Sequence, residues 1–280
     1  NVLKIKHTDG QVSEHRINAI STIKDTLILP KKDSVNFIQK TKTCAYSIVN
    51  SNKSVAVIDI NSFKGRHWRS FFRKSFKDIK QNNISNLVIG LRDNGGGQIP
   101  YGLNFLSYLI HENLILPFDR KPNLMMFNPK YKMGFGTRIT PFVFSTLLPQ
   151  LPIHGRLRHY FVSLPKKRNA YKGNIYVLIN GKSFSMSGVS STYLKYKANA
   201  TIIGEETGGN VAGSNAVISG HILLPNTNIK VQIPMYHIYH DIDVKNKARG
   251  LMPDYPTHYT KEDILNGIDV DLKKVLELVR

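Results

Sequence analysis

The sequence of 280 residues contains a single cysteine, Cys44. One thiol excludes a disulfide within the chain and any metal cluster held by several thiolates, so we expect Cys44 to be a small core residue. Long hydrophobic runs are also lacking: the nearest candidate, Phe142 to Leu151, is interrupted by polar residues and Pro149. The first residues, Asn1 to Lys6, do not have the pattern of a signal peptide.

Acidic residues are scarce. The chain has 19 Asp and Glu against 39 Lys and Arg, which gives a net charge of +20. Basic residues are concentrated between Lys121 and Arg168, where no Asp or Glu occurs. Such a charge attracts anionic molecules, including nucleic acids, without specificity. Because RNP-like, zinc-finger and helix-turn-helix patterns are missing, we expect a basic face or a groove for acidic ligands, with no specific nucleic-acid partner.

The length and the 41% hydrophobic content predict one large folded domain, or one domain and a smaller piece. Residues 1–50 predict strands at Leu3–Lys6 and Ser21–Ile28, with a hairpin turn at Asp9-Gly10. We therefore expect a small β-rich N-terminal segment without its own full core, such as the tail of an upstream domain. The main domain is expected over residues 51–280.

Strands and helices alternate more clearly from Ser54 onward, which is typical of an α/β fold. Apolar runs predict buried strands at Ser54–Ile60, Leu87–Leu91, Asn174–Asn180 and Ala200–Gly204. Apolar spacing predicts helices at Trp68–Ile79, Ile99–His111, Val189–Tyr196, Lys261–Leu265 and Val270–Val279. A hairpin is predicted from Ile218–Leu224 and Ile229–Ile238. Residues 117–172 show little periodicity, and we expect an irregular excursion over a crevice.

The most informative stretch runs from Tyr171 to Gly209. Its order of strand, tight turn, helix and strand predicts a parallel right-handed crossover. The turn carries Ser185 at the start of the helix, where free N–H groups and the helix dipole favour an anion such as the oxyanion of acyl transfer. Serines at this position are also common as plain helix caps.

A second loop, with three glycines at Gly95–Gly97, follows the strand at Leu87–Leu91. Glycines let a backbone approach a ligand closely, with N–H groups free to donate. The loop lacks the lysine of a phosphate-binding loop and the spacing of a dinucleotide-binding loop. Because loops at the carboxyl ends of neighbouring parallel strands meet at one crevice, we expect Gly95–Gly97 to lie near Ser185.

Four motifs stand in one order along the chain. They are Leu91-Arg92-Asp93-Asn94-Gly95-Gly96-Gly97, Ser183-Phe184-Ser185-Met186-Ser187, Gly204-Glu205-Glu206-Thr207-Gly208-Gly209 and Gly250-Leu251-Met252-Pro253-Asp254. The ordered set resembles the S41 family of serine peptidases, also called tail-specific or carboxyl-terminal processing peptidases. It is most similar to the envelope-associated bacterial, tricorn-core-like branch, and it covers the chain from about Ser54 to the C-terminus.

This resemblance implies a crotonase/Clp-like core of stacked ββα units that hydrolyses peptide bonds as an endopeptidase. It places the nucleophile at Ser185 and the oxyanion donors at the backbone N–H groups of Gly96 and Met186, with Gly95, Gly97 and Asn210 in support. It further implies a peptide or protein substrate, no cofactor and no metal. The location it implies is the cell envelope or the outside of the cell, periplasmic or as a lipoprotein.

The general base is not identified by the resemblance. In lysine-dependent members, a Lys follows the Gly-Glu-x-Thr turn, whereas Asn210 stands here and cannot take a proton from a serine at neutral pH. Gly188 replaces the Glu that those members carry three residues after the nucleophile. Tricorn-like members use a His from an N-terminal segment, for which we find no matching element. Two hypotheses stay open: the base lies upstream of Asn1, or the protein binds a peptide or apolar ligand without catalysis.

The remaining titratable residues give no base from the sequence. His237 and His240 are three residues apart, so in a strand they face opposite sides and form a poor metal pair. The other candidates are expected at helix edges or in loops: His67, His111, His154, His159 and His258. Asp241, Asp243 and Asp254 lie in the region where tricorn-like members place an acidic site residue.

Overall fold

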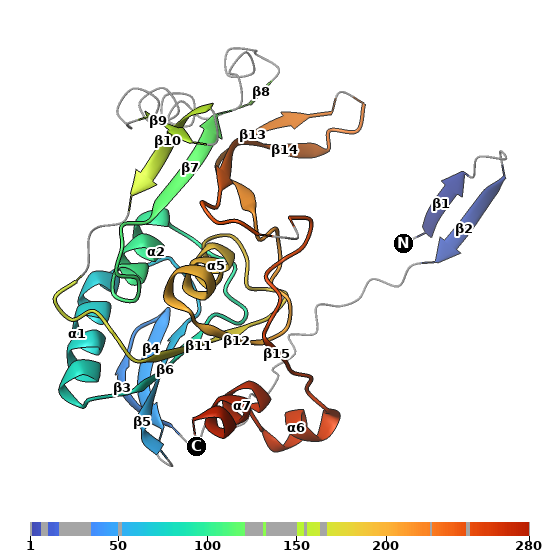
Figure 1. Cartoon of the computed structure of the whole chain (residues 1–280). Coiled ribbons are helices and arrows are strands. Elements are labelled where there is room, and N and C mark those ends of the chain that lie inside the picture. Colours follow the sequence, from blue (N-terminus) through green and yellow to red (C-terminus); the bar gives the residue numbers. More distant parts are fainter. Residues whose placement is uncertain are drawn as a thin grey trace.

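A computed structural model of the chain describes residues 2–6, 11–16, 35–49, 52–120, 131–132, 150–153, 156–162, 167–224, 226–244 and 247–279. Two large sheets form most of this part. Helices lie between the two sheets and beside the larger one (Figure 1). The α/β class expected from the sequence is confirmed.

The larger sheet has seven strands. In spatial order they are β15 (Tyr255–Pro256), β12 (Thr201–Gly204), β11 (Asn174–Ile179), β6 (Asn86–Gly90), β5 (Asn52–Ile60), β4 (Cys44–Val49) and β3 (Val35–Lys40). The strands from β15 to β5 run parallel to one another, whereas β5, β4 and β3 form an antiparallel meander. The four buried strands predicted from apolar runs are confirmed, and so is the parallel crossover from β11 to β12.

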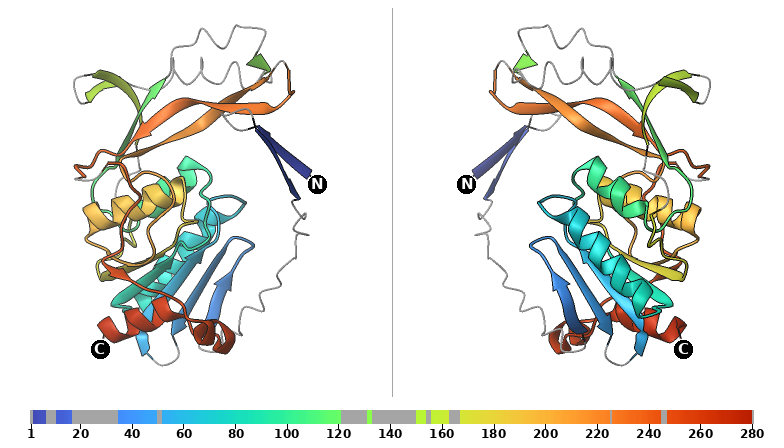
Figure 2. Two further views of the ribbon diagram at one scale, coloured as in Figure 1. Left: turned by 90° about the vertical axis from the view of Figure 1, so that its right-hand side faces the viewer. Right: turned by 90° about the vertical axis from the view of Figure 1, so that its left-hand side faces the viewer.

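Helices cover both faces of this sheet, as the three views show (Figures 1 and 2). On one face lie α1 (Trp68–Gln81), α2 (Ile99–Leu106) and α5 (Met186–Ala198). On the other lies α7 (Val270–Leu278), which follows the short α6 (Lys261–Asn266). Among the described residues, no helix combines the length and the apolar character that crossing a bilayer requires.

Period-two alternation in β5 explains why both faces are covered. Ala56 and Ile58 join the cluster under α1, α2 and α5, whereas Val55 and Val57 join the cluster under α7. A strand buried on both faces appears in the sequence as a continuous apolar run. Cys44 is buried as expected, with its Sγ 2.9 Å from the hydroxyl of Tyr101. Burial raises the pKa of this thiol.

The predicted helices are present, with differences in length: α1 and α5 are longer than predicted. The aromatic residues of α1 are buried in the core, which confirms the amphipathic pattern. The helix predicted to reach His111 ends at Leu106 instead. Ser107 Oγ donates to the carbonyl of Asn104 at 2.7 Å, and the chain continues in tighter turns that place the Tyr108 ring flat against Phe76. This local packing ends the helix despite the helical spacing of the sequence.

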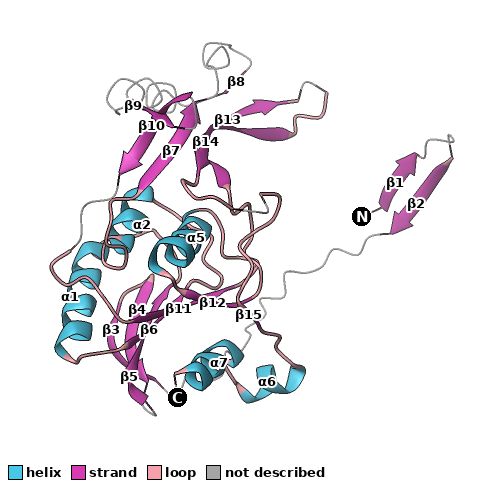
Figure 3. Cartoon of the chain, viewed as in Figure 1, coloured by secondary structure: helices cyan, strands magenta, loops and turns pink. Residues whose placement is uncertain are grey.

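The second sheet has six antiparallel strands and lies at the end of the molecule next to α2 and α5 (Figures 1 and 3). In spatial order they are β8 (Tyr131–Lys132), β13 (Gly213–Leu223), β14 (Lys230–Tyr239), β7 (Ile115–Arg120), β10 (Arg156–Val162) and β9 (Gln150–Ile153). The hairpin predicted from Ile218–Leu224 and Ile229–Ile238 is confirmed, with longer strands. In its described parts the segment 117–172 is not irregular, because its strands pair with this distant hairpin.

The N-terminal residues divide between two sheets. β1 (Val2–Lys6) and β2 (Val12–Arg16) form a two-stranded antiparallel sheet, whereas β3 and β4 extend the large sheet. The boundary expected near residue 50 therefore falls inside the β4–β5 hairpin. The turn at Asp9-Gly10 and the strand predicted at Ser21–Ile28 lie outside the described residues.

An ion cluster joins the glycine loop to the C-terminal helices. The guanidinium of Arg92 donates two parallel hydrogen bonds to Asp269, at 2.7 and 2.8 Å, and further bonds to Asp271 and to the hydroxyl of Tyr259. Burial alone would raise the pKa of Asp269, but the hydrogen bonds and charge of Arg92 hold it at about 2. The charged carboxylate is thus preferred in the folded protein.

This cluster predicts an acid-dependent stability. Because the pKa of Asp269 is lowered from 3.8 to about 2 by folding, its contribution of about 2 kcal/mol is complete above pH 4 and is lost as the pH falls towards 2. Asp269→Asn should lower the free energy of unfolding by about this amount at pH 7, and the difference from wild type should shrink below pH 4. Chemical denaturation across pH measures it. Glu277→Gln, in an exposed pair with Lys274, is the control and should change stability little.

Candidate functional site

Two loops meet at the carboxyl ends of the paired parallel strands β6 and β11. The loop after β6 contains the glycines, and the loop after β11 leads to Ser185. Their contact is a set of direct hydrogen bonds: the N–H of Phe184 donates to the carbonyl of Asn94 at 3.0 Å, and Ser183 Oγ donates to the carbonyl of Leu91 at 2.8 Å. The expected meeting of these two loops at one edge of the sheet is confirmed.

The three serines of this turn have different surroundings. Ser183 and Ser187 are fully buried, and their hydroxyls lie 2.8 and 3.4 Å from the carbonyl of Leu91, to which they donate. The side chain of Ser185 is half-buried and has no hydrogen-bond partner among the described residues. The outer two serines therefore fix the turn, while Ser185 presents a free hydroxyl.

The backbone at Ser185 has an unusual conformation. Its φ is 54° and its ψ is −124°, and the N–H of Ser187 donates to the carbonyl of Phe184 across it at 3.1 Å. These values match the first central position of a type II′ turn, which normally holds glycine. A non-glycine residue with such a φ costs roughly 1–3 kcal/mol. A sharp, strained strand-to-helix turn of this kind exposes a side chain at the top of a sheet.

Gly96 lies directly against the serine turn. A Cβ added at Gly96 would lie 2.7 Å from the Cβ of Ser185 and 2.8 Å from the nitrogen of Met186. The φ of Gly96 is +94°, which also favours glycine. Only a residue without a side chain permits this approach, so the backbone of the glycine loop lies in direct contact with the serine turn.

The backbone N–H groups around Ser185 are not equally available. The N–H of Gly96 donates to Asn94 Oδ1 at 2.8 Å, and the Asn94 amide donates to the carbonyl of Ile60 at 2.7 Å. In the described part of the chain, the N–H groups of Gly95, Gly97 and Met186 have no acceptor. The amide of Met186 is the first of α5, where the helix offers no internal partner.

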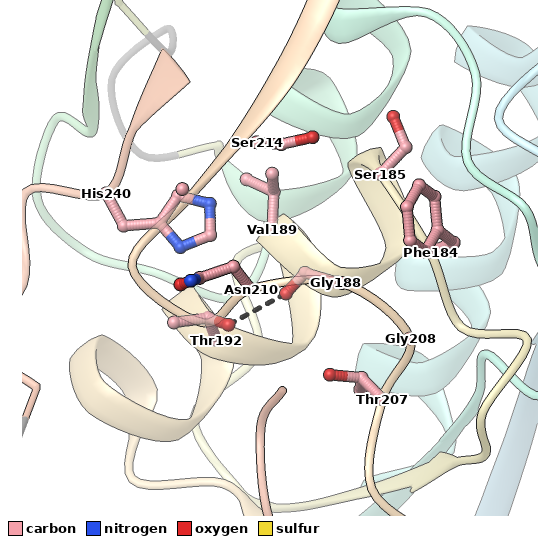
Figure 4. Close-up of a pocket in the computed structure, with 12 residues that line it drawn as sticks. Phe184, Ser185, Gly188, Val189, Thr192, Thr207, Gly208, Asn210, Ser214 and His240 are labelled. Atoms are coloured by element: carbon pink, nitrogen blue, oxygen red, sulfur yellow. Dashed lines mark hydrogen bonds between the residues drawn. The ribbon is translucent and has the colours of Figure 1, made fainter. Parts of the chain in front are cut away.

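A small polar pocket lies on one side of Ser185 (Figure 4). It is lined by Phe184, Ser185, Gly188, Val189, Thr192, Thr207, Gly208, Gly209, Asn210, Gly213, Ser214 and His240. The imidazole of His240 turns an edge toward Ser214 and Val189, and the hydroxyl of Ser185 does not point at it (Figure 4). Asn210 and Gly188, where the resemblance described above led us to expect a Lys and a Glu, lie in the same pocket as Ser185.

His240 is a member of this pocket that the sequence did not indicate. Its Nδ1 lies 2.6 Å from the carbonyl of Val211, while its Nε2 is buried without a partner among the described residues. Burial lowers the pKa of His240 to about 4, so the ring is neutral at pH 7. Only the pairing of β13 with β14 brings His240 to the pocket, and no local sequence signal marks that register.

Asn210 has a structural role. Its side-chain oxygen accepts from the N–H of Ala212 at 2.7 Å, and its amide nitrogen donates to the carbonyl of Lys247. Both functional groups of Asn210 are thus used by the turn that begins β13. The side chain neither contacts Ser185 by a hydrogen bond nor has a free acceptor for its proton.

A larger, mostly apolar cavity of about 410 Å³ opens on the other side of Ser185. It is lined by Gly97, Gln98, Ile99, Pro100, Leu116, Phe161, Ser185, Met186, Val189, Ser214 and Ile238. Leu116, Phe161 and Ile238 come from β7, β10 and β14, so the second sheet forms one wall. This volume and lining are typical of a site that takes an apolar group. No local pattern in the sequence marks these wall residues.

The three acidic candidates, and the two lysines nearest to Ser185 in the sequence, make no hydrogen bond to it. Asp254 accepts from the N–H of Ile202 at 2.9 Å and pairs with Lys195 at 2.5 Å, which gives both a structural role. Asp241 and Asp243 line a neighbouring groove that also includes Asn210 and His240. Lys182 is exposed and pairs with Asp93. The structure does not bring these groups into hydrogen-bond contact with Ser185.

The described residues contain no group of three or more His, Cys, Asp or Glu placed to hold a metal ion. His237 and His240 have separate partners: the Nδ1 of His237 lies 2.9 Å from Asn215 Oδ1, and that of His240 lies against Val211.

Comparisons with known proteins identify the family and the fold. The sequence profile described as Peptidase family S41 matches residues 54–257. The structure of mature CPAF is similar, with a TM-score of 0.63 and 18% identity over 99% of this chain and 66% of that one. A protein from Parabacteroides merdae ATCC 43184 has a TM-score of 0.60 and 19% identity over 90% of this chain and 67% of that one. The chain spans about two thirds of the length of both proteins. A comparison with curated proteins gives no match.

The close approach at Gly96 predicts different results for two neighbouring glycines. Gly96→Ala forces a Cβ into Ser185 and Met186 at a positive φ, and should lower the free energy of unfolding by roughly 1–3 kcal/mol. A Cβ at Gly95 meets nothing within 4 Å, so Gly95→Ala is the matched control and should have wild-type stability. Thermal denaturation of both variants measures this. Equal stability of the two would contradict the contact between the loops.

Proposed function

Because the chain belongs to peptidase family S41, we propose that it is a serine endopeptidase in which Ser185 attacks the carbonyl carbon of a peptide bond. One observation carries the assignment of the nucleophile. Among the three serines of the turn, Ser185 alone has a hydroxyl without a partner in the described residues, on a strained turn that faces the glycine loop.

The amides at this point suit the charge that forms during acyl transfer. As Ser185 Oγ bonds to the carbonyl carbon, the carbonyl oxygen becomes an oxyanion, and prearranged N–H donors stabilise it. The proposed donors are the free N–H of Met186, at the positive end of α5, and an N–H of the glycine loop. Gly96 can serve only by exchanging its bond to Asn94, whereas the amides of Gly95 and Gly97 are already free. One such donor is worth about 2.7–4 kcal/mol of transition-state stabilisation in other serine peptidases.

We propose that the general base, which accepts the hydroxyl proton of Ser185, is not among the described residues. Asn210 is held by its own turn and offers no base. His240 lies in the pocket, but a pKa of about 4 makes its imidazole a weak base at neutral pH. The assignment of the nucleophile therefore does not depend on the identity of the base.

The apolar cavity beside Ser185 indicates the kind of substrate. A peptide whose scissile carbonyl sits between Ser185 and the amides can place a neighbouring side chain in this cavity. Its wall of Leu116, Phe161 and Ile238 would bury a large apolar side chain and exclude a charged one. We therefore assign to this protein a preference for peptides with large apolar residues beside the cleaved bond.

A second function is favoured by the hydrogen bonds of Asn210. If no base reaches Ser185, the same crevice would bind an extended peptide or apolar ligand without cleaving it. Ser185→Ala would then leave ligand affinity unchanged.

As part of the main proposal, the resemblance also implies a place in the cell envelope or outside the cell, which fractionation of producing cells would test.

The nucleophile assignment predicts selective labelling. A fluorophosphonate probe should label Ser185, and Ser185→Ala should abolish labelling and reduce peptide hydrolysis by about 10⁴-fold or more. Ser214 also lines the pocket with a hydroxyl that lacks a partner among the described residues, so Ser214→Ala is the matched control and should keep the label. Mass spectrometry locates the adduct. A folded protein that takes no label at Ser185 would refute the peptidase assignment and leave the binding function.

The apolar cavity predicts a measurable preference. Peptides with Leu or Phe beside the cleaved bond should have a kcat/KM about 10–200-fold above that of the matching Asp peptide. Ile99→Asp should reduce this ratio, because it charges the cavity wall while a carboxylate at the start of α2 is compatible with the helix dipole. Ile264→Asp, on the exposed side of α6, is the control. An unchanged ratio in Ile99→Asp would show that the cavity does not bind the substrate side chain.

A further inference from the structure

One aromatic side chain next to the proposed nucleophile is exposed. Most of the described phenylalanines are buried in the core, whereas Phe184, which directly precedes Ser185, is 47% exposed. Within the described part of the chain, its ring contacts no other aromatic ring and no cation. A single exposed apolar residue is common on protein surfaces, so exposure alone assigns no role to it. The position of the ring carries the argument.

The backbone of Phe184 is held on both sides. Its N–H donates to the carbonyl of Asn94 at 3.0 Å, and its carbonyl accepts from the N–H of Ser187 at 3.1 Å. The first bond joins the serine turn to the glycine loop, and the second closes the turn across Ser185. The side chain of Phe184 therefore starts from a fixed point beside Ser185.

The ring of Phe184 lies against two glycines of the loop after β12. A Cβ added at Gly208 would lie 3.0 Å from Cδ2 of this ring, and one added at Gly209 would lie 3.0 Å from its Cε2. The absence of side chains at both positions makes room for the ring, which lies close to Ser185 (Figure 4). These contacts restrict the ring before a ligand arrives, so binding against its exposed part costs little side-chain entropy.

Phe184 and the apolar cavity are on different sides of Ser185. The ring lines the small polar pocket and the neighbouring groove of about 960 Å³, but it does not line the apolar cavity. In an extended peptide, successive side chains point to opposite sides. If one residue beside the cleaved bond occupies the apolar cavity, the residue on the other side of that bond is directed towards Phe184 and the groove.

We propose that Phe184 is a specificity-determining residue that packs against the substrate side chain across the cleaved bond from the apolar cavity. This inference deepens the proposed peptidase function and rests on it. An exposed phenyl ring offers apolar area together with the faces and edges that aromatic pairs use. The preferred side chain at this second position is therefore aromatic.

The experiment varies the two residues beside the cleaved bond independently, in peptides of otherwise fixed sequence, and locates each cut by mass spectrometry. At the second position, wild type should prefer Phe to Ala. Phe184→Ala should lower this ratio of kcat/KM values by about 10-fold, because the pair of rings and its buried area are both lost. Phe184→Leu, which keeps apolar area without a ring, should give an intermediate ratio. Ile99→Asp should change the preference at the first position instead.

Tyr196→Ala is the matched control. It removes a ring that is 43% exposed on α5 and that lines none of the three pockets, so both preferences should stay at their wild-type values. A ratio of specificities is read because a structural role of Phe184 would not change it. Loss of the same factor for the Phe and the Ala peptides would show that the ring only supports Ser185, and would overturn the inference.

Failure of the peptidase function gives a different result. In that case the wild-type protein neither reacts with the fluorophosphonate probe nor cleaves any peptide, and the affinities of the same peptides are measured by fluorescence anisotropy. Phe184→Ala should then weaken binding of the Phe peptide more than binding of the Ala peptide. An unchanged preference for Phe over Ala in Phe184→Ala, in hydrolysis or in binding, would overturn the role of Phe184 while the assignment of Ser185 stands or falls by its own labelling.

Discussion

The candidate site depends on hydrogen bonds that converge on the loop after β6. The carbonyl of Leu91 accepts from Ser183 and Ser187, and the carbonyl of Asn94 accepts from the N–H of Phe184. These bonds hold the serine turn and the glycine loop together at the end of two paired strands. The two outer serines are used in this way, whereas the hydroxyl of the middle one has no partner among the described residues.

The same contact explains two unfavourable features of the backbone conformation. Ser185 adopts a positive φ, and Gly96 has no room for a side chain. Strain of this kind persists only where the surroundings fix it, and it is common at active sites. Asn94 is fully buried and links the glycine loop to the end of β5, while Arg92 links it to the C-terminal helices. The loop is therefore fixed from several sides before any substrate binds.

Much of this arrangement could be predicted from local sequence. Continuous apolar runs identify β5, β6, β11 and β12 because these strands are buried on both faces. Parallel pairing then places the loops that follow β6 and β11 at one edge, which predicts the neighbourhood of Ser185 and Gly96. The role of the outer serines could not be predicted, since helix capping and loop anchoring use the same residue types.

Features made by distant strand pairs could not be predicted. β7 and β10 belong to a sheet whose central hairpin lies much later in the chain, so residues 117–172 show little pattern of their own. For the same reason, the apolar cavity wall of Leu116, Phe161 and Ile238 and the position of His240 could be found only from the structure. Asn210 shows a further limit: nothing in the local sequence indicates its role, and only its bonds to Ala212 and Lys247 show that it serves a turn.

The central claim concerns where an oxyanion would lie, and a crystal structure of the fluorophosphonate adduct at Ser185 tests it most directly. A phosphoryl oxygen is expected within hydrogen-bond distance of the N–H of Met186 and of one N–H in Gly95–Gly97, with the substituent directed to the apolar cavity. An adduct whose phosphoryl oxygen faces solvent, away from both amides, would contradict it.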